Sequence, residues 1–197
     1  MLRSVCVFCG SSFGNHKAYE EAAKQVGSLL CDHGIELVYG GGNVGLMGAV
    51  ADACLQAGGR VVGVIPQALA DKEVAHTGLT ELVIVSSMHE RKAMMADRAD
   101  AFIALPGGYG TWEEFIEGLT WSQLGFQKKA CGVLNVNGYY DPLLALADRA
   151  VVEGFLKQVH RDLLIEDTQA GALLQKLKKY VPSTADKWIS STSHAKD

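Results

Sequence analysis

The sequence has no excess of positive charge: 18 Lys and Arg residues stand against 22 Asp and Glu residues, which gives a net charge of -4 at pH 7. This balance argues against a nucleic-acid partner, which would need a basic surface. The chain also lacks an apolar run near the roughly 18 residues that span a membrane. After Arg3 it enters the short apolar stretch 5–8 directly, without the segment and cleavage site of a signal peptide. We therefore expect a cytoplasmic protein with no membrane partner.

Metal-site and disulfide patterns are missing as well. The five cysteines are odd in number and lie mostly among apolar residues. Cys6 and Cys9 form a C-x-x-C pair, but residues three apart in a strand point to opposite faces. No second Cys or His pair has zinc spacing, and there is no H-E-x-x-H. We interpret the cysteines as core residues of a cytosolic protein and expect no metal.

Several catalytic motifs are absent too. No G-x-x-x-x-G-K-[ST] run is present to support P-loop ATP hydrolysis, and Ser11 and Ser12 lie outside any G-x-S-x-G elbow. Gly40 to Gly45 matches G-x-G-x-x-G, but it follows the second predicted strand, and the next strand ends in Pro66 without an acid for a ribose. An NAD site is therefore disfavoured. The run is either a tight turn with close helix–strand packing or a substrate contact.

Strand and helix patterns alternate along the 197 residues. Apolar runs predict strands at 3–9, 35–39, 60–65, 82–85, 101–105 and 131–136. Helical spacing or helix boundary signals predict helices at 17–32, 46–56, 88–98, 111–124, 142–153 and 173–180. Strands that are apolar throughout indicate a parallel sheet covered on both faces. We predict one α/β domain, a Rossmann-like doubly wound sheet over 1–181, followed by a flexible polar tail at 182–197.

Three loops rich in Gly or Ser follow strands of this sheet, at 10–12, 40–48 and 107–111. In doubly wound sheets ligands bind at the carboxyl ends of the strands, so these loops are expected to meet there. The run from Pro106 to Glu114 is the most informative, because three glycines in four positions leave backbone N–H groups unshielded where a strand passes into a helix. Such a junction is suited to binding phosphate.

Two readings remain open for the polar residues near this loop. Thr111 and Glu114 have the spacing of a capping box, so Glu114 either caps the helix or meets a ribose. Arg91 either pairs with a phosphate or carboxylate, or belongs to a surface charge cluster with Glu90, Lys92 and Arg98. Spacing alone favours the surface cluster. His89 has no positioned partner in the sequence.

The nine residues 106–114, PGGYGTWEE, match the P-G-G-x-G-T-x-x-E signature of the LOG ("lonely guy") family. Members are cytokinin riboside 5'-monophosphate phosphoribohydrolases, long mislabelled as lysine decarboxylases. The resemblance continues over nearly the whole chain in further motifs, which in order are Phe8 to Ser12, Tyr39 to Gly42, Gly45 to Gly48, Met88 to Lys92, Ala101 to Glu114, Thr120-Trp121 and Gly138 to Asp141. On these motifs the chain is identified as a member of the family.

The resemblance implies a Rossmann-like homodimer that uses neither cofactor nor metal. It would cleave the N-glycosidic bond of an N6-modified adenosine 5'-monophosphate, or of AMP, to free base and ribose 5-phosphate. The catalytic pair falls on Arg91 and Glu114. The substrate-binding candidates are Glu73, Lys92, Gly108, Tyr109, Gly110, Thr111, Glu113 and Thr120, with Ser11, Gly41, Gly42 and Met88 beside them. Around Glu73 the sequence departs from the family pattern.

The expected chemistry follows from the bond that breaks. An oxocarbenium-like sugar is stabilised by a nearby carboxylate, here Glu114, which also activates water. Arg91 is expected either to keep Glu114 ionised by lowering its pKa or to contact the substrate directly. Two alternatives stay open: a non-catalytic nucleotide carrier, and a pyridoxal-phosphate decarboxylase with Lys92 as the Schiff-base lysine. The joint presence of Arg91 and Glu114 favours catalysis.

Overall fold

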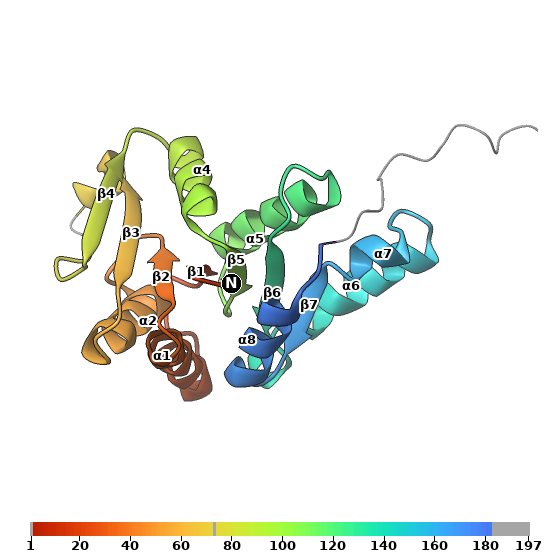
Figure 1. Cartoon of the computed structure of the whole chain (residues 1–197), viewed down its shortest axis with the longest axis horizontal. Helices are drawn as coiled ribbons and strands as arrows, with labels where there is room; N and C mark the ends of the chain where they lie inside the picture. Colours follow the sequence, from red (N-terminus) through yellow and green to blue (C-terminus); the bar gives the residue numbers. More distant parts are fainter. Residues whose placement is uncertain (1, 73, 183–197) are drawn as a thin grey trace, which may run out of the picture.

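The computed structural model describes residues 2–72 and 74–182. Its centre is a seven-stranded parallel sheet in the order β4-β3-β2-β1-β5-β6-β7 (Figure 1). The strands are β1 (Ser4–Phe8), β2 (Glu36–Tyr39), β3 (Val61–Pro66), β4 (Glu81–Val85), β5 (Ala101–Ala104), β6 (Ala130–Leu134) and β7 (Leu164–Asp167). The predicted α/β class and parallel sheet are confirmed.

Helices cover both faces of the sheet (Figure 1). They are α1 (Lys17–Asp32), α2 (Gly45–Gln56), α3 (Gln67–Ala70), α4 (Met88–Arg98), α5 (Tyr109–Gln123), α6 (Asp141–Val152), α7 (Gln158–Arg161) and α8 (Ala170–Lys179), with a short 3-10 helix, η1, at Val136–Gly138. On one face, α1, α2 and α8 bury Leu30, Leu46 and Leu173. On the other, α4 and α5 bury Met95 and Phe115. Burial on both faces explains why the central strands are apolar over most of their length.

The last strand was missed by the sequence analysis. β7 reads Leu-Ile-Glu-Asp and pairs only with β6 at the edge of the sheet. A strand at the edge of a sheet is partly exposed to solvent and needs fewer apolar residues. Its sequence therefore lacks the apolar run by which the other strands were predicted. The short elements α3, α7 and η1 were also not predicted. Most of the predicted tail, 183–197, and the candidate Glu73 lie outside the described residues.

Cys6, Cys9, Cys54 and Cys131 are buried and Cys31 is partly buried, and Cys6 and Cys9 point to opposite faces of the sheet as the strand argument predicted. Cys6 packs into the core beneath α4 and α5, whereas Cys9 packs into the core beneath α1 and α2. All five are free thiols, and burial raises the pKa of Cys6 well above its usual value. Within the described ranges no group of His, Cys, Asp and Glu could hold a metal ion, and no helix is long and apolar enough to cross a membrane.

The chain reverses its direction across the sheet between β1 and β5. Strands β1 to β4 build outward on one side, and β5 to β7 build outward on the other. The loops after these two central strands therefore diverge to opposite sides and leave a crevice between them, which is where such sheets bind ligands. Residues 10–12 follow β1 at this point, and residues 106–108 follow β5.

Candidate active site

The three predicted loops meet at the carboxyl edge of the sheet. The Gly10 N–H donates to Pro106 O at 3.0 Å, and the Leu46 N–H donates to Gly10 O at 3.0 Å. Gly45 has a φ of 58°, and a Cβ there would lie 2.3 Å from the backbone of Ser11, so this approach requires glycine. Together the loops border a cleft of about 310 Å³. Their predicted shared location is confirmed.

Helix α5 begins at Tyr109, two residues earlier than predicted, with Gly108 as its N-cap. The prediction that Thr111 and Glu114 form a capping box is therefore wrong, because both residues lie inside the helix. The first helical hydrogen bond runs from the Trp112 N–H to Gly108 O at 3.1 Å. Glycine disfavours helix interiors, so Gly110 gives no local signal for the first turn of a helix. The packed loops nevertheless fix Gly110 in the first turn. A capping serine occurs instead at α4, where Ser87 Oγ accepts from the Glu90 N–H at 3.1 Å.

The start of α5 is open to the cleft. No side chain of the described residues caps it. The N–H groups of its first residues, Tyr109, Gly110 and Thr111, therefore have no intrahelical partner and carry the positive end of the helix dipole. A Cβ added to Gly108 or Gly110 would meet nothing within 4 Å, so the space above these residues is empty. Unpaired donors beside empty space form a site for an anion such as phosphate.

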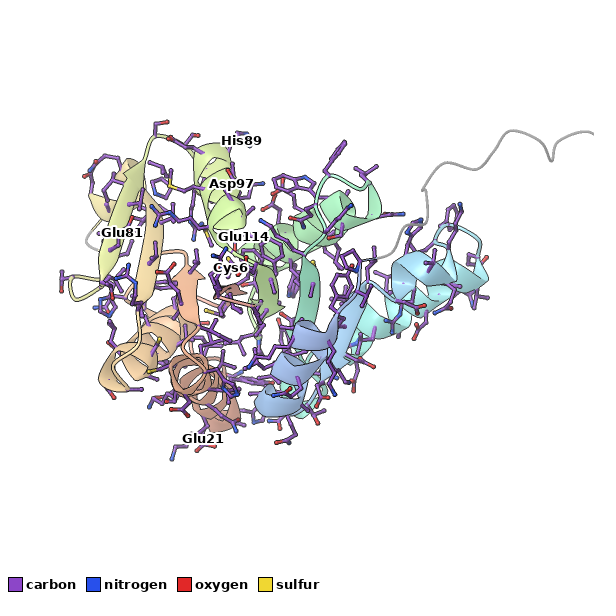
Figure 2. All side chains as sticks on the ribbon, in the orientation of Figure 1. Cys6, Glu21, Glu81, His89, Asp97 and Glu114 are labelled. Carbon is purple, nitrogen blue, oxygen red and sulfur yellow. The ribbon has the colours of Figure 1, made fainter. Side chains whose placement is uncertain are left out.

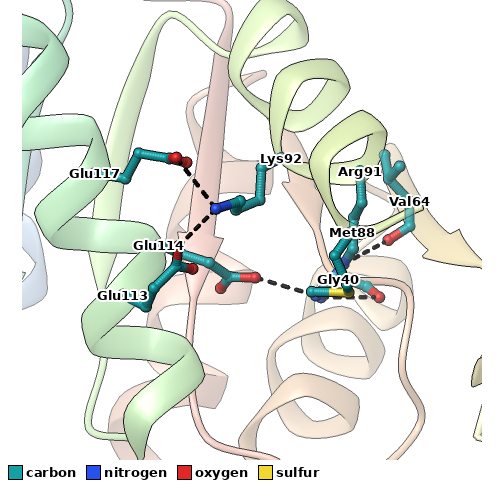
Figure 3. Close-up of polar contacts among 8 residues, drawn as sticks. All are labelled: Gly40, Val64, Met88, Arg91, Lys92, Glu113, Glu114 and Glu117. Carbon is teal, nitrogen blue, oxygen red and sulfur yellow. Dashed lines mark hydrogen bonds and ion pairs between the residues drawn. The ribbon is translucent and has the colours of Figure 1, made fainter.

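Arg91 on α4 and Glu114 on α5 form an ion pair at one side of this cleft. Arg91 Nη1 lies 3.1 Å from Glu114 Oε1, and the two side chains are only 11% and 9% exposed. The guanidinium also donates to Val64 O at 3.1 Å and to Gly40 O at 3.4 Å (Figure 3). The surface-cluster reading is therefore wrong for Arg91, because carbonyl groups of β3 and of the residue after β2 hold it in the interior.

The pKa of the Glu114 carboxyl is raised above its ordinary value. Burial is the largest cause, and Arg91 opposes it by favouring the charged form. Figure 2 shows Glu114 and Cys6 toward the middle of the molecule, whereas His89 lies at the outer end of α4. The expectation that Arg91 would lower this pKa considered only the smaller of two opposing effects. A carboxyl whose pKa is raised is better suited to accept and return a proton near neutral pH.

Lys92 lies on the other side of Glu114. Its Nζ is 2.5 Å from Glu113 and 3.1 Å from Glu117, both on α5 (Figure 3). The hydrogen bond to Glu113 is the main cause that raises the pKa of Lys92, which keeps it an ammonium ion. An ammonium ion is not a nucleophile, so the structure argues against Lys92 as a Schiff-base lysine. Neither Lys92 nor Glu113 borders the cleft.

The other candidates fall into two groups. Those that border the cleft are Ser11, Gly42, Gly108, Tyr109, Gly110 and Thr111. Gly41 does not border it, because its left-handed backbone (φ 75°) packs against β3. Thr120 bonds to Ile116 O at 2.8 Å and borders a separate groove between α5 and α6. Met88 is exposed, with its sulfur 3.9 Å from Arg91 Nη1.

An apolar wall of the cleft was missed by the sequence analysis. It consists of Met47, Ile65, Leu69 and Val74. The segment that carries Val74 is tied to the glycine loop, because Val74 O accepts from the Asn43 N–H at 2.7 Å. These apolar residues come from α2, the end of β3, α3 and a loop, and in a sequence they look like ordinary core residues, so no motif identifies this wall. Only the packing of the loops brings it to the same cleft as the start of α5.

Residues 47–177 match the model of a family described as possible lysine decarboxylases. A probable cytokinin riboside 5'-monophosphate phosphoribohydrolase of Oryza sativa subsp. japonica, LOGL1, is 54% identical over 91% of this chain and 80% of its own length. The cytokinin riboside 5'-monophosphate phosphoribohydrolase LOG2 of Arabidopsis thaliana is 50% identical over 94% of this chain and 87% of its own length.

Two solved structures share the fold. The molybdenum cofactor binding protein of Rippkaea orientalis has a TM-score of 0.68 at 19% identity and covers 90% of this chain and 96% of its own. The molybdenum cofactor carrier protein of Chlamydomonas reinhardtii has a TM-score of 0.67 at 16% identity, over 90% of this chain and 97% of its own. At these identities the likeness concerns the fold alone.

Proposed function

The chain belongs to the LOG family of cytokinin riboside 5'-monophosphate phosphoribohydrolases, and we propose from this membership that it hydrolyses the N-glycosidic bond of AMP or of an N6-modified adenosine 5'-monophosphate. The products are the free base and ribose 5-phosphate. One observation supports this more than any other. The buried pair of Arg91 and Glu114 borders the same cleft as the uncapped start of α5. A phosphate site and a carboxylate are thus held side by side.

The cleft offers a place for each part of the substrate. Backbone N–H groups at Gly108, Gly110 and Thr111 bind the 5'-phosphate. The apolar wall, which includes Ile65 and Leu69, is suited to a flat purine ring and to an apolar substituent on it. With the phosphate and the base bound at these two places, the ribose lies between them. Its C1' carbon then faces Glu114.

The proposed reaction uses this placement. As the bond between C1' and the base nitrogen breaks, positive charge develops on the sugar, and the Glu114 carboxylate stabilises it. Water adds to C1', and Glu114 accepts a proton from it. One hydrogen of the water ends on the released base and the other on the new hydroxyl group of ribose 5-phosphate. Arg91 orients the carboxylate through their 3.1 Å contact and favours its charged form.

A product assay tests the proposal. Purified protein is incubated with AMP or with isopentenyladenosine monophosphate, without added cofactor, and free base and ribose 5-phosphate are measured. We expect the wild type to release both products from at least one substrate, and Glu114→Gln to release neither at a comparable rate. Tight binding of both nucleotides by the wild type without turnover of either would contradict catalysis and favour the carrier alternative.

We further propose that the protein works in the cytoplasm as a homodimer. Helix α5 exposes Tyr109, Trp112 and Ile116, and large apolar side chains grouped in this way are suited to burial by a second copy. Free cysteines fit a reducing compartment. Light scattering should give about twice the chain mass of 21.1 kDa. Trp112→Glu should shift the mass to that of one chain, and a wild-type monomer would contradict the dimer.

A further inference from the structure

The carbonyl groups of Leu105, Pro106 and Gly107, in the loop after β5, each accept a hydrogen bond from another segment of the chain. Leu105 O accepts from the Tyr140 hydroxyl at 2.6 Å, Pro106 O accepts from the Gly10 N–H at 3.0 Å, and Gly107 O accepts from the Tyr139 hydroxyl. Both tyrosines precede α6, more than thirty residues further along the chain. Neither tyrosine borders the cleft, whereas Gly108 does.

This arrangement fixes the direction of one amide group. In a trans peptide, the C=O of one residue and the N–H of the next point in opposite directions. Because the Tyr139 hydroxyl holds Gly107 O on the side away from the cleft, the N–H of Gly108 is turned toward the cleft. The peptide that follows Leu105 differs, since Pro106 has no N–H to direct. The bond from Tyr140 therefore anchors the loop without orienting a donor.

The segment that carries Tyr139 is itself firmly held. Asn135 accepts from the Tyr140 N–H at 2.8 Å and donates to Asp141 at 2.7 Å. The ring of Tyr139 packs edge-on against Tyr140 and Tyr19, with centroids 5.1 and 6.0 Å away. Because the ring of Tyr139 is held in place, its hydroxyl also holds Gly107 O in place. A mobile side chain on the surface would not do so.

We propose that Tyr139 is a positioning residue of the phosphate-binding loop, which acts by orienting the Gly108 N–H toward the 5'-phosphate of the substrate. The inference rests on the proposed function. The phosphate is the same before and during reaction, so this donor contributes equally to binding the ground state and the transition state. Loss of the Tyr139 hydroxyl is therefore expected to raise KM and to leave kcat nearly unchanged.

The test compares two matched variants, Tyr139→Phe and Tyr140→Phe, each of which removes one hydroxyl that bonds the same loop. We measure kcat and KM for AMP, and the rise in Tm that inorganic phosphate produces. Tyr139→Phe should raise KM roughly tenfold and lose most of the phosphate-dependent rise in Tm. Tyr140→Phe, whose hydroxyl is more deeply buried, should lower the Tm of the free protein while KM and the phosphate effect stay near wild type.

Each outcome distinguishes the inference from the proposed function. If KM and the phosphate effect of Tyr139→Phe equal those of the wild type, the inference is overturned. It is also overturned if Tyr140→Phe raises KM as much as Tyr139→Phe. Loss of any hydrogen bond to the loop would then weaken phosphate binding, and the orientation of the Gly108 N–H would not be the cause. If the wild type hydrolyses neither AMP nor isopentenyladenosine monophosphate, the proposed function fails, and the phosphate-dependent Tm of the two variants still decides the role of Tyr139.

Discussion

A Cβ atom on Gly40 would lie 1.9 Å from Nη2 of Arg91. Gly40 is the first residue after β2, and the guanidinium of Arg91 occupies the space where any side chain at position 40 would have to be. The glycine is thus required by an arginine 51 residues away. Part of the glycine loop that resembles a dinucleotide motif therefore makes room for the Arg91–Glu114 pair.

Gly40→Ala should accordingly disrupt the site through Arg91. The methyl group displaces the guanidinium from Glu114, and a displacement of about 1 Å in a catalytic group can lower the rate about 100-fold. We expect kcat for AMP to fall by that order and the free energy of unfolding by about 1–3 kcal/mol. Gly171→Ala on α8, where a Cβ meets nothing within 4 Å, is the matched control; it should leave kcat unchanged and should not lower the free energy of unfolding, because alanine favours a helix more than glycine does.

Glu114→Gln should lose about 10²- to 10⁴-fold in kcat, because the amide neither accepts a proton nor carries a charge. Its oxygen can still accept from Arg91, so the Tm should remain within a few degrees of wild type. The control is Glu113→Gln at the neighbouring position. Glu113 is 55% exposed and forms an ion pair with Lys92, which also pairs with Glu117. Removing the charge of Glu113 therefore leaves Lys92 paired and should leave kcat close to wild type. Equal losses in both variants would disprove a distinct role for Glu114.

The pH dependence should reveal the raised pKa of Glu114. The carboxyl must be ionised to act, so kcat/KM should fall with decreasing pH around a midpoint above about 4.3, the ordinary value for glutamate. Stability should show the opposite trend. The folded state binds this proton more tightly than the unfolded state, so the contribution of Glu114 to the free energy of unfolding decreases as pH rises from the ordinary to the raised pKa. Both trends should be absent from Glu114→Gln.

Arg91→Lys should shift this profile. A lysine cannot reproduce the planar fork that reaches Glu114, Val64 O and Gly40 O together. The carboxylate then loses part of its stabilisation, and the acidic midpoint of kcat/KM should move to higher pH, with a loss of roughly 10- to 100-fold at the optimum. A profile that coincides with that of the wild type would show that a positive charge alone is sufficient at position 91.

The two glycines before α5 should respond differently to alanine. At Gly107 a Cβ would lie 2.1 Å from Thr111 Oγ1, so Gly107→Ala should lower the free energy of unfolding by about 1–3 kcal/mol. At Gly108 a Cβ would extend into empty space, so Gly108→Ala should leave the Tm unchanged. It should instead occupy the phosphate site and raise KM for AMP about 10-fold or more. Thermal unfolding and steady-state kinetics of both variants separate the two effects.

Most of the fold could be predicted from the sequence because its signals are local. Apolar runs bounded by glycine and proline identified six strands, and helical spacing identified the helices that cover them. The edge strand β7 was missed because its Glu166 and Asp167 interrupt the apolar pattern. The start of α5 was misplaced because glycine suggests the end of a helix, whereas loop packing held Gly110 in the first turn.

For the site, the sequence by itself determined which chemical groups are present and at which edge of the sheet the loops meet. A strand and the glycine-rich turn that follows it are each specified by a short segment of consecutive residues. The tertiary structure decided that Arg91 is buried, that the pKa of Glu114 is raised, and that Tyr139 holds the Gly107 carbonyl. Burial and desolvation depend on what distant segments place around a side chain, and no local pattern contains that information.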